Sequence, residues 1–359
     1  MSKAPPSESG HFRTGYADEF RLIESRFAKV ATVAFALVLI GFPFVAAPFY
    51  IDLATQVFLA SIGALALMLL TGIAGQISLG HAGLIAAGAF TAGILFKEYA
   101  LPFWVTIPLA AVTGALLGLI FGLPSLRLRG LYLAVSTLAL HFVVVYLGGE
   151  YETRAGFSTG ILVDPPKLFG WEVYKPAAWY FVLLAATLCA LYVCINLMRS
   201  RSGRAWRAIH ANETVAEALG INVARYKLLA FVVSSSMTAV AGALFAYYRG
   251  FVSIEAFSLY LTIQYVAMII IGGMGSLLGA LLGATFVTLF PYLIEGLMDV
   301  LPGADRLAGS VFAVNYAAFG VVMVLFLVFE PQGLVGIWRR LRDYFQFWPF
   351  RTKSLGGRG

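Results

Sequence analysis

Residues that could perform covalent or metal chemistry are scarce in this sequence and form no known motif. His81 and His141 stand alone among apolar residues, and the spacing of Cys189 and Cys194 fits neither a redox pair nor a metal site. The sequence contains no GxxxxGK(S/T) loop to hold nucleotide phosphates, no HExxH zinc motif and no GxSxG nucleophile elbow. It therefore predicts a chain with no catalytic residue and no metal site, which does not hydrolyse ATP by itself.

Neutral amides within the apolar segments could instead hydrogen-bond a solute. They are Gln56, Gln76, Gln264 and Asn315. Glu295 and Asp299 lie near the outer end of one apolar segment, and no segment has an Asp, Glu, Lys or Arg residue at its centre. An ion-coupled carrier usually keeps such a residue inside its helix bundle, so we expect the energy for transport to come from another chain. A secondary carrier driven by an ion gradient is the alternative.

The stretch 72–83 joins two apolar segments without one charged residue. Each glycine in it disfavours a helix by about 1 kcal/mol, so we predict a helix break at membrane depth, where the backbone must be covered by protein or line a cavity. Many transporters bind solute at unwound backbone of this kind, and close packing is an equally good explanation. The residues predicted to line a solute path are Gly75, Gln76, Ser78, Gly80, His81 and Gly83.

A second glycine-rich stretch, 272–283, predicts close contact between helices. Gly275, Gly279 and Gly283 recur at every fourth position and would share one helix face. A face without side chains lets a neighbouring backbone approach closely. We therefore expect these glycines to serve helix packing.

The stretch 199–227 is the only long charged segment set between apolar runs. Its apolar residues have helical spacing, and Gly220 then offers the left-handed stop that ends many helices. The apolar stripe consists of Ala205, Ala208, Ile209, Val215, Ala216 and Leu219. We predict one or two short amphipathic helices across a membrane face, with Trp206, flanked by Arg204 and Arg207, as an anchor for a partner. A solvated loop that only carries topogenic arginines is the alternative.

The composition shows that these stretches are embedded in a membrane protein. With 60% hydrophobic and 12% charged residues, the chain has far fewer charges than a water-soluble protein. A bilayer span needs about 20 apolar residues. Candidate spans are 30–50, 53–73, 82–96, 102–123, 130–148, 178–198, 228–248, 259–275, 277–298 and 310–329. We predict an all-α polytopic membrane protein with about ten transmembrane helices and no cleaved signal peptide.

The positions of the basic residues predict the orientation of the chain. Most of the 25 Lys and Arg lie in 1–29, 124–129, 199–227 and 330–359, which the positive-inside rule places in the cytoplasm with both termini. This location explains the net charge of +7 without nucleic acid, and it leaves 149–176 as a long outer loop that docks a protein or acts as a spacer. The predicted parts are a cytoplasmic arm (1–29), a transmembrane domain (30–335) and a basic cytoplasmic tail (336–359).

Several stretches, taken in order along the chain, carry a family resemblance. They are LLTGIAGQISLGHAGLIAAGAF (69–90), LRLRGLYLAVSTLA (126–139), SGRAWRAIHANE (202–213), ALGIN (218–222) and MIIIGGMGS (268–276). These stretches resemble the LivM type of the LivH/LivM family, the permease subunits of ATP-binding cassette (ABC) importers for branched-chain amino acids.

The resemblance implies a fold like that of the vitamin B12 and ribose permeases, in the bacterial inner membrane. The implied partners are a second permease of the LivH type, two cytoplasmic ATPases that carry the ATP and Mg, and a periplasmic substrate-binding protein; this chain itself has no cofactor. In that fold the loop after the sixth helix enters a groove on the ATPase, which makes 199–222 the coupling helix. The residues assigned to coupling are Arg204, Trp206, Arg207, Ile209, Glu213, Glu217, Leu219 and Gly220.

The outer loop departs from the family pattern. Where the family has a Thr-Gly-Gly-rich turn, this chain has TRAGFSTG at 153–160. Relatives also import urea, short amides or aromatic acids. We therefore expect the solute to be a branched-chain amino acid or a related small carboxylated or amide compound.

Overall fold

The structure is a computed structural model that describes residues 26–128, 130–156, 160–168, 171–300 and 311–347. Its contacts divide the chain into two units, one formed by residues 52–337 and the other by residues 1–51 with 338–359. In the second of these, the described residues form α1 (Arg26–Val45), the first turn of α2 (Pro48–Leu67) and most of α14 (Gly333–Phe347). All sites discussed below lie within residues 52–337.

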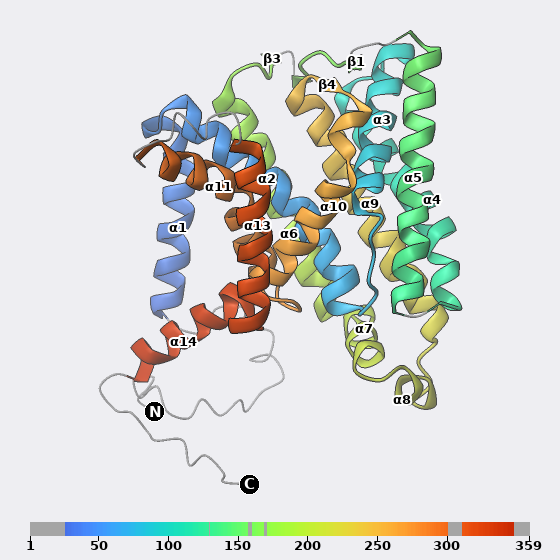
Figure 1. Ribbon diagram of the computed structural model, residues 1–359, viewed down its shortest axis with the longest axis vertical. Helices are drawn as coiled ribbons and strands as arrows, with labels where there is room; N and C mark the ends of the chain where they lie inside the picture. Colours follow the sequence, from blue (N-terminus) through green and yellow to red (C-terminus); the bar gives the residue numbers. More distant parts are fainter. Residues whose placement is uncertain (1–25, 129, 157–159, 169–170, 301–310, 348–359) are drawn as a thin grey trace, which may run out of the picture. The chain divides into compact units, whose positions relative to one another are not determined.

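The unit 52–337 is helical, with two short pairs of strands (Figure 1). After α2 the chain continues as a π-helical segment (Met68–Ile73). The helices that follow are α3 (His81–Tyr99), α4 (Phe103–Gly122), α5 (Leu131–Arg154), α6 (Pro176–Arg199), α7 (Arg201–Ala211), α8 (Glu213–Ala218), α9 (Val223–Arg249), α10 (Leu259–Gly272), α11 (Leu277–Val300) and α13 (Val311–Phe329). Strand β1 (Ile161–Leu162) pairs with β4 (Phe251–Val252), and β2 (Lys167–Leu168) pairs with β3 (Trp171–Glu172).

A helix covers each apolar segment that the sequence predicts as a span, and the all-α membrane class is confirmed. Among the described residues, the stretches long and apolar enough to cross a bilayer are Pro48–Ile73, Phe103–Gly122, Leu131–Arg154, Pro176–Arg199, Val223–Arg249 and Leu277–Met298. A further span arises if the bent pair Ala313–Phe329 and Gly333–Arg342 counts as one. The number of about ten spans is not confirmed: α10 has 14 residues, fewer than the roughly 20 that a bilayer needs.

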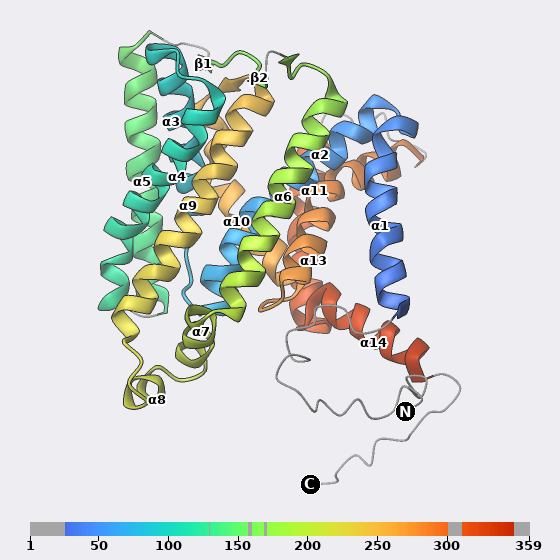
Figure 2. The same cartoon turned by 180° about the vertical axis from the view of Figure 1, so that it is seen from behind.

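Helix α9 packs against α3 and α4, and both views show these helices side by side (Figures 1 and 2). Gly88 of α3 faces the carbonyl of Ala239, and Gly242 of α9 faces the carbonyl of Ile85. A Cβ atom at either glycine would overlap that backbone oxygen. Helices α3 and α9 therefore touch backbone to backbone, as small residues permit.

The second glycine-rich stretch brings α10 and α11 together. Gly283 faces the carbonyl of Met268, and a Cβ atom on Gly279 would lie 2.5 Å from the carbonyl oxygen of Gly273. Gly275 was expected on the same helix face, and this expectation is corrected: α11 begins at Leu277, and Gly275 lies in the preceding turn with a φ of +84°. Its role is to allow the left-handed turn between the helices.

The loop after α5 is tied to the segment after α9. Ile161 of β1 pairs with Val252 of β4, and both side chains are fully buried. Two residues after Val252, the backbone N–H of Ile254 donates to Oε1 of Glu152 at 3.1 Å. Within the described part of the loop 149–176, Glu152 and Ile161 are thus tied to the segment after α9.

Candidate functional site

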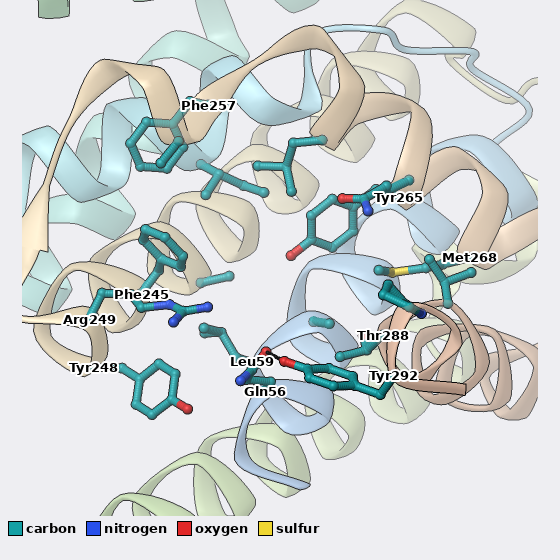
Figure 3. A pocket seen from close by; sticks show the side chains of 18 of the residues that line it. Gln56, Leu59, Phe245, Tyr248, Arg249, Phe257, Tyr265, Met268, Thr288 and Tyr292 are labelled. Atoms are coloured by element: carbon teal, nitrogen blue, oxygen red, sulfur yellow. Dashed lines mark hydrogen bonds between the residues drawn. The ribbon is translucent and has the colours of Figure 1, made fainter. Parts of the chain in front are cut away.

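A cavity of about 360 Å³ lies among α2, α9, α10 and α11 (Figure 3). A volume of this size is typical of small-molecule sites. The lining residues of α9 come from its C-terminal end, whereas α7 and α8 precede its N-terminal end. The cavity and the charged stretch 199–227 therefore lie at opposite ends of the same long helix.

A chain of hydrogen bonds fixes the polar wall of the cavity. Tyr248 Oη donates to Oδ1 of Asp52, and Gln56 Nε2 donates to Oδ2 of the same carboxylate at 2.8 Å. Tyr292 Oη donates to Oε1 of Gln56 at 3.5 Å (Figure 3). Because both oxygens of Asp52 accept a bond, its charge is satisfied, and the side chains of Gln56 and Tyr292 are held facing the cavity. Gln56 and Gln264, which the sequence offers as hydrogen-bonding groups, both line this cavity.

Two side chains of opposite charge also line the cavity. Arg249 lies at the end of α9, and Glu295 lies three residues after Tyr292 on the cavity face of α11. Both retain solvent access. The sequence does not predict a role for Arg249, which is a single charge at the end of an apolar segment. Its position directly after Tyr247 and Tyr248 is the local feature that could have pointed to it.

The rest of the wall is apolar or aromatic. Leu59, Phe257 and Met268 contribute their side chains, and Tyr265 directs its hydroxyl into the cavity (Figure 3). Behind Tyr265, the ring of His81 lies with its centroid 4.6 Å from the tyrosine ring. His81 was predicted to line a solute path; it does not line this cavity, and its ring contacts Tyr265, which does.

The helix break predicted within 72–83 is present at residues 74–80. Gln76 is buried, and its Nε2 donates to the backbone oxygen of Lys227 at 3.2 Å. The backbone N–H of Leu79 donates to Oγ1 of Thr137 at 2.9 Å. The Thr137 hydroxyl thus satisfies one backbone N–H that the break leaves without a helical partner, and the carbonyl of Lys227 satisfies the side-chain amide of Gln76.

The remaining residues of the break contact other helices. A Cβ atom on Gly80 would lie 2.5 Å from the carbonyl oxygen of Thr137, and one on Gly83 would lie 2.8 Å from Cα of His141. Ser78 is buried, and Gly75, with a φ of +71°, faces the ring of His210. The cavity of about 360 Å³ is lined by none of the residues Gly75, Gln76, Ser78, Gly80, His81 and Gly83. Direct contact of these residues with a solute stays a prediction.

The stretch 199–227 contains the two short helices α7 and α8. They meet at Asn212, whose Oδ1 accepts from the backbone N–H of Val215 at 3.1 Å and caps α8. At the other end, Gly220 has a φ of +82°. The N–H groups of Gly220 and Ile221 donate to the carbonyls of Glu217 and Ala216 at 2.9 and 3.1 Å, which is the Schellman arrangement. The predicted left-handed stop is therefore present.

The apolar face of α7 is buried within this subunit. Trp206 and Ile209 are only 1% and 6% exposed, and Trp206 Nε1 donates to the backbone oxygen of Tyr226 at 2.8 Å. The expectation that these side chains meet a partner is corrected. Helical spacing shows that a face is apolar, but the side chains that cover it here come from the chain itself.

The arginines beside Trp206 bond to the end of α6. Arg207 Nη2 donates to the carbonyl of Met198 at 2.8 Å, and Arg204 Nη1 donates to the carbonyl of Arg199 at 3.0 Å. Carbonyls at a helix C-terminus lack helical partners and favour cations. Arg204 and Arg207 thus use some of their donors within the chain, and their contact with a partner stays a prediction.

Helix α8 presents the surface that is left. Leu219 is 75% exposed and Val215 is 53% exposed, and Glu217 between them is also exposed. Two apolar side chains beside a carboxylate on a short, capped helix form a surface suited to a protein partner.

Contacts connect this helix pair to the break at residues 74–80, between the π-helical segment and α3. Lys227 Nζ lies 2.6 Å from Oε1 of Glu213 in an ion pair, and the backbone oxygen of Lys227 is the acceptor for Gln76. His210 Nδ1 lies 3.2 Å from the carbonyl oxygen of Ile73, at the end of the π-helical segment. Both α7 and α8 are thus linked to the residues that interrupt the helix.

Comparison with known proteins identifies relatives. A family described as branched-chain amino acid transport system, permease component, matches residues 49–329. The high-affinity branched-chain amino acid transport system permease proteins LivM of Salmonella typhimurium and Escherichia coli are each 31% identical over 335 residues, covering 87% of this chain and 76% of the relative. A probable LivM of Methanocaldococcus jannaschii is 28% identical over 235 residues, covering 64% of this chain and 67% of that protein. No solved structure matches.

Proposed function

This chain belongs to the family of permease components of branched-chain amino acid transport systems, and from that membership we propose how it is assembled and driven. It is a multi-pass membrane subunit of a transport system. We place it in the bacterial inner membrane, beside a second permease of the LivH type. Two cytoplasmic ATPases supply ATP hydrolysis, and a periplasmic protein delivers the solute.

The observation that carries this proposal is the link of α8 to α9. The exposed surface of α8, formed by Val215, Glu217 and Leu219, is available to an ATPase. The ion pair between Glu213 and Lys227 joins α8 to α9. A force on α8 is therefore transmitted to a helix that lines the cavity at its far end.

A second route leads through α7. The bond between His210 and the carbonyl of Ile73 connects α7 to the π-helical end of α2, and α2 contributes Gln56 and Leu59 to the cavity. A span that is interrupted at 74–80 can change direction at the break while its turns before the break stay folded. In our proposal, displacement of α7 and α8 tilts α2 and α9 relative to α10 and α11, which opens the cavity to one side or the other.

An ion-coupled carrier is the alternative, and one observation favours it. Arg249 and Glu295 line the cavity, and ionisable groups in a solute path are typical of ion-driven carriers. Both side chains keep solvent access, however, so neither is the buried group through which an ion gradient is usually coupled.

The energy source distinguishes the two functions. The chain is co-purified with the proposed ATPases, second permease and binding protein, and uptake of radiolabelled leucine into proteoliposomes is measured. Uptake should require ATP on the ATPase side and should persist when ionophores abolish ion gradients. Vesicles loaded with ADP are the control. Uptake that continues without ATP and stops with ionophores would establish the carrier instead.

A further inference from the structure

The guanidinium group of Arg249 is positioned at the cavity but has free donors. Its Cζ lies 5.9 Å from the ring centroid of Phe245 and 5.7 Å from that of Tyr248, and such contacts orient a cation over aromatic rings. Tyr248 is fixed in turn by its bond to Asp52. Within the described residues, Arg249 has neither a hydrogen bond nor an ion pair. Its planar fork is therefore open to a ligand carboxylate, which it can bind through two bonds.

Glu295 supplies the opposite charge on another helix. Thr288, Tyr292 and Glu295 are spaced by four and three residues on α11, so they share the face that lines the cavity. In the described part of the chain, Glu295 also lacks a hydrogen bond and an ion pair. Its carboxylate can accept bonds from an ammonium group.

The apolar part of the wall has space for an aliphatic group. Leu59, Leu261 and Met268 are aliphatic, and Phe257 closes this side. The hydroxyl of Tyr265 enters the cavity from the same side (Figure 3). A solute with a branched aliphatic side chain would be stabilised here by burial of apolar surface. A strongly polar side chain would lose its hydrogen bonds to water and find few partners on this wall.

We propose that this cavity is a recognition site for a zwitterionic amino acid with an aliphatic side chain. Arg249 binds the α-carboxylate, Glu295 binds the α-ammonium group, and the wall around Leu59, Phe257 and Met268 accepts the side chain. The permease thus selects its solute by itself, in addition to any selection by a binding protein. This inference rests on the proposed function, because it assumes that the cavity lies on the transport path.

The pair of charges favours a zwitterion over the other solutes considered for this family. A carboxylic acid without an amine leaves Glu295 unpaired, and a neutral amide or urea satisfies neither charge. Such solutes forgo one or both of the charge-assisted bonds that a zwitterion can form here. A zwitterion matches both charges, and Arg249 and Glu295 are therefore specificity-determining residues in this proposal.

The test measures equilibrium binding of tritiated leucine to the complete importer prepared without its binding protein. Unlabelled leucine, leucine amide and 4-methylpentanoate serve as competitors; the amide lacks the carboxylate and the acid lacks the ammonium group. The variants are Arg249→Met and Glu295→Gln. Arg154→Met is the matched control, because Arg154 is an exposed arginine of α5 that pairs with Glu150 outside the cavity. Assembly and basal ATP hydrolysis are checked for each variant.

Wild-type importer should bind leucine and discriminate strongly against both analogues. Arg249→Met should weaken leucine binding at least about tenfold and remove the discrimination against leucine amide. Glu295→Gln should remove the discrimination against 4-methylpentanoate. Arg154→Met should match the wild type.

The inference would be overturned if both variants bound leucine and discriminated between the competitors as the wild type does. It would also be overturned if the wild-type importer did not bind leucine. ATP-driven leucine uptake by the same preparation shows whether the proposed function itself holds. If uptake is present while the variants behave as wild type, only the recognition site is refuted; if ATP-driven uptake is absent, the proposed function fails.

Discussion

Gly80 and Gly83 show how closely the broken helix is packed at the level of single residues. Both face α5, and the atoms nearest to an added Cβ belong to the backbone, namely the carbonyl of Thr137 and Cα of His141. Backbone atoms cannot rotate away as a side chain can. Substitution at either position must therefore displace α5 or the break itself.

Replacing Gly80 or Gly83 with leucine should abolish leucine uptake while leaving membrane insertion largely intact. The physical reason is displacement of the break, which in our proposal transmits motion to α2. Gly320→Leu is a matched control, because no atom lies within 4 Å of a Cβ added at Gly320. Uptake into proteoliposomes and protein content in the membrane are measured for all three variants. Normal uptake by both break variants would show that the tight contacts are not needed for transport.

Single residues also show what can and cannot be predicted from the sequence. The stop at Gly220 depends on local backbone geometry, which a glycine after an amphipathic run indicates well. The roles of Arg249 and Tyr265 depend on how α2, α9, α10 and α11 pack, and that packing brings together residues far apart in the chain. No local pattern contains this information, so the cavity could not be predicted while two of its amides, Gln56 and Gln264, could.

At the level of elements, α7 and α8 have different roles despite forming one charged segment. The sequence predicts amphipathic helices here, and both are present. Periodicity does not tell which surface covers an apolar face, and α7 turns out to pack against its own subunit through Trp206 and Ile209. Changing Ile209 to Asp would bury a charge and should impair folding. Helix α8 is therefore the better place to test coupling.

Leu219→Asp and Glu217→Lys should each reduce co-purification of the ATPases, or leucine-stimulated ATP hydrolysis, at least about tenfold, which corresponds to ~1.4 kcal/mol of binding free energy. Both side chains are exposed, so the permease itself should remain folded. Leu162→Asp is a matched control, since Leu162 is 65% exposed in β1 and lies outside α8. Full ATPase association and transport in both variants would leave the segment as a topogenic loop.

At the level of the whole molecule, the distribution of basic residues predicts the sidedness. The family membership and the helices agree with a multi-pass permease. Residues near 303 and 354, which the distribution assigns to the outer side and to the cytoplasm, lie outside the described residues. Tyr174 and Leu219, which are 80% and 75% exposed, are suitable positions for cysteine probes of the sidedness. They lie in stretches assigned to opposite sides of the membrane.

In a background with Cys189 and Cys194 replaced by alanine, Tyr174→Cys should react with an impermeant maleimide added to intact cells. Leu219→Cys should react only after the membrane is permeabilised, as should Ser202→Cys. Labelling is read by mass shift, and the cysteine-free chain is the control. Reaction of position 219 or 202 in intact cells would reverse the orientation and with it the proposed site for the ATPases.

The caps at both ends of α8 have a consequence for the thermodynamics of assembly. Asn212 closes the first turn and the Schellman bonds at Gly220 close the last, so the helix has its own hydrogen bonds before any partner arrives. A segment that becomes ordered only on binding loses conformational entropy at that moment, which weakens the complex. A helix already ordered avoids this loss, and a modest contact area at Val215 and Leu219 can then support the association with an ATPase that we propose.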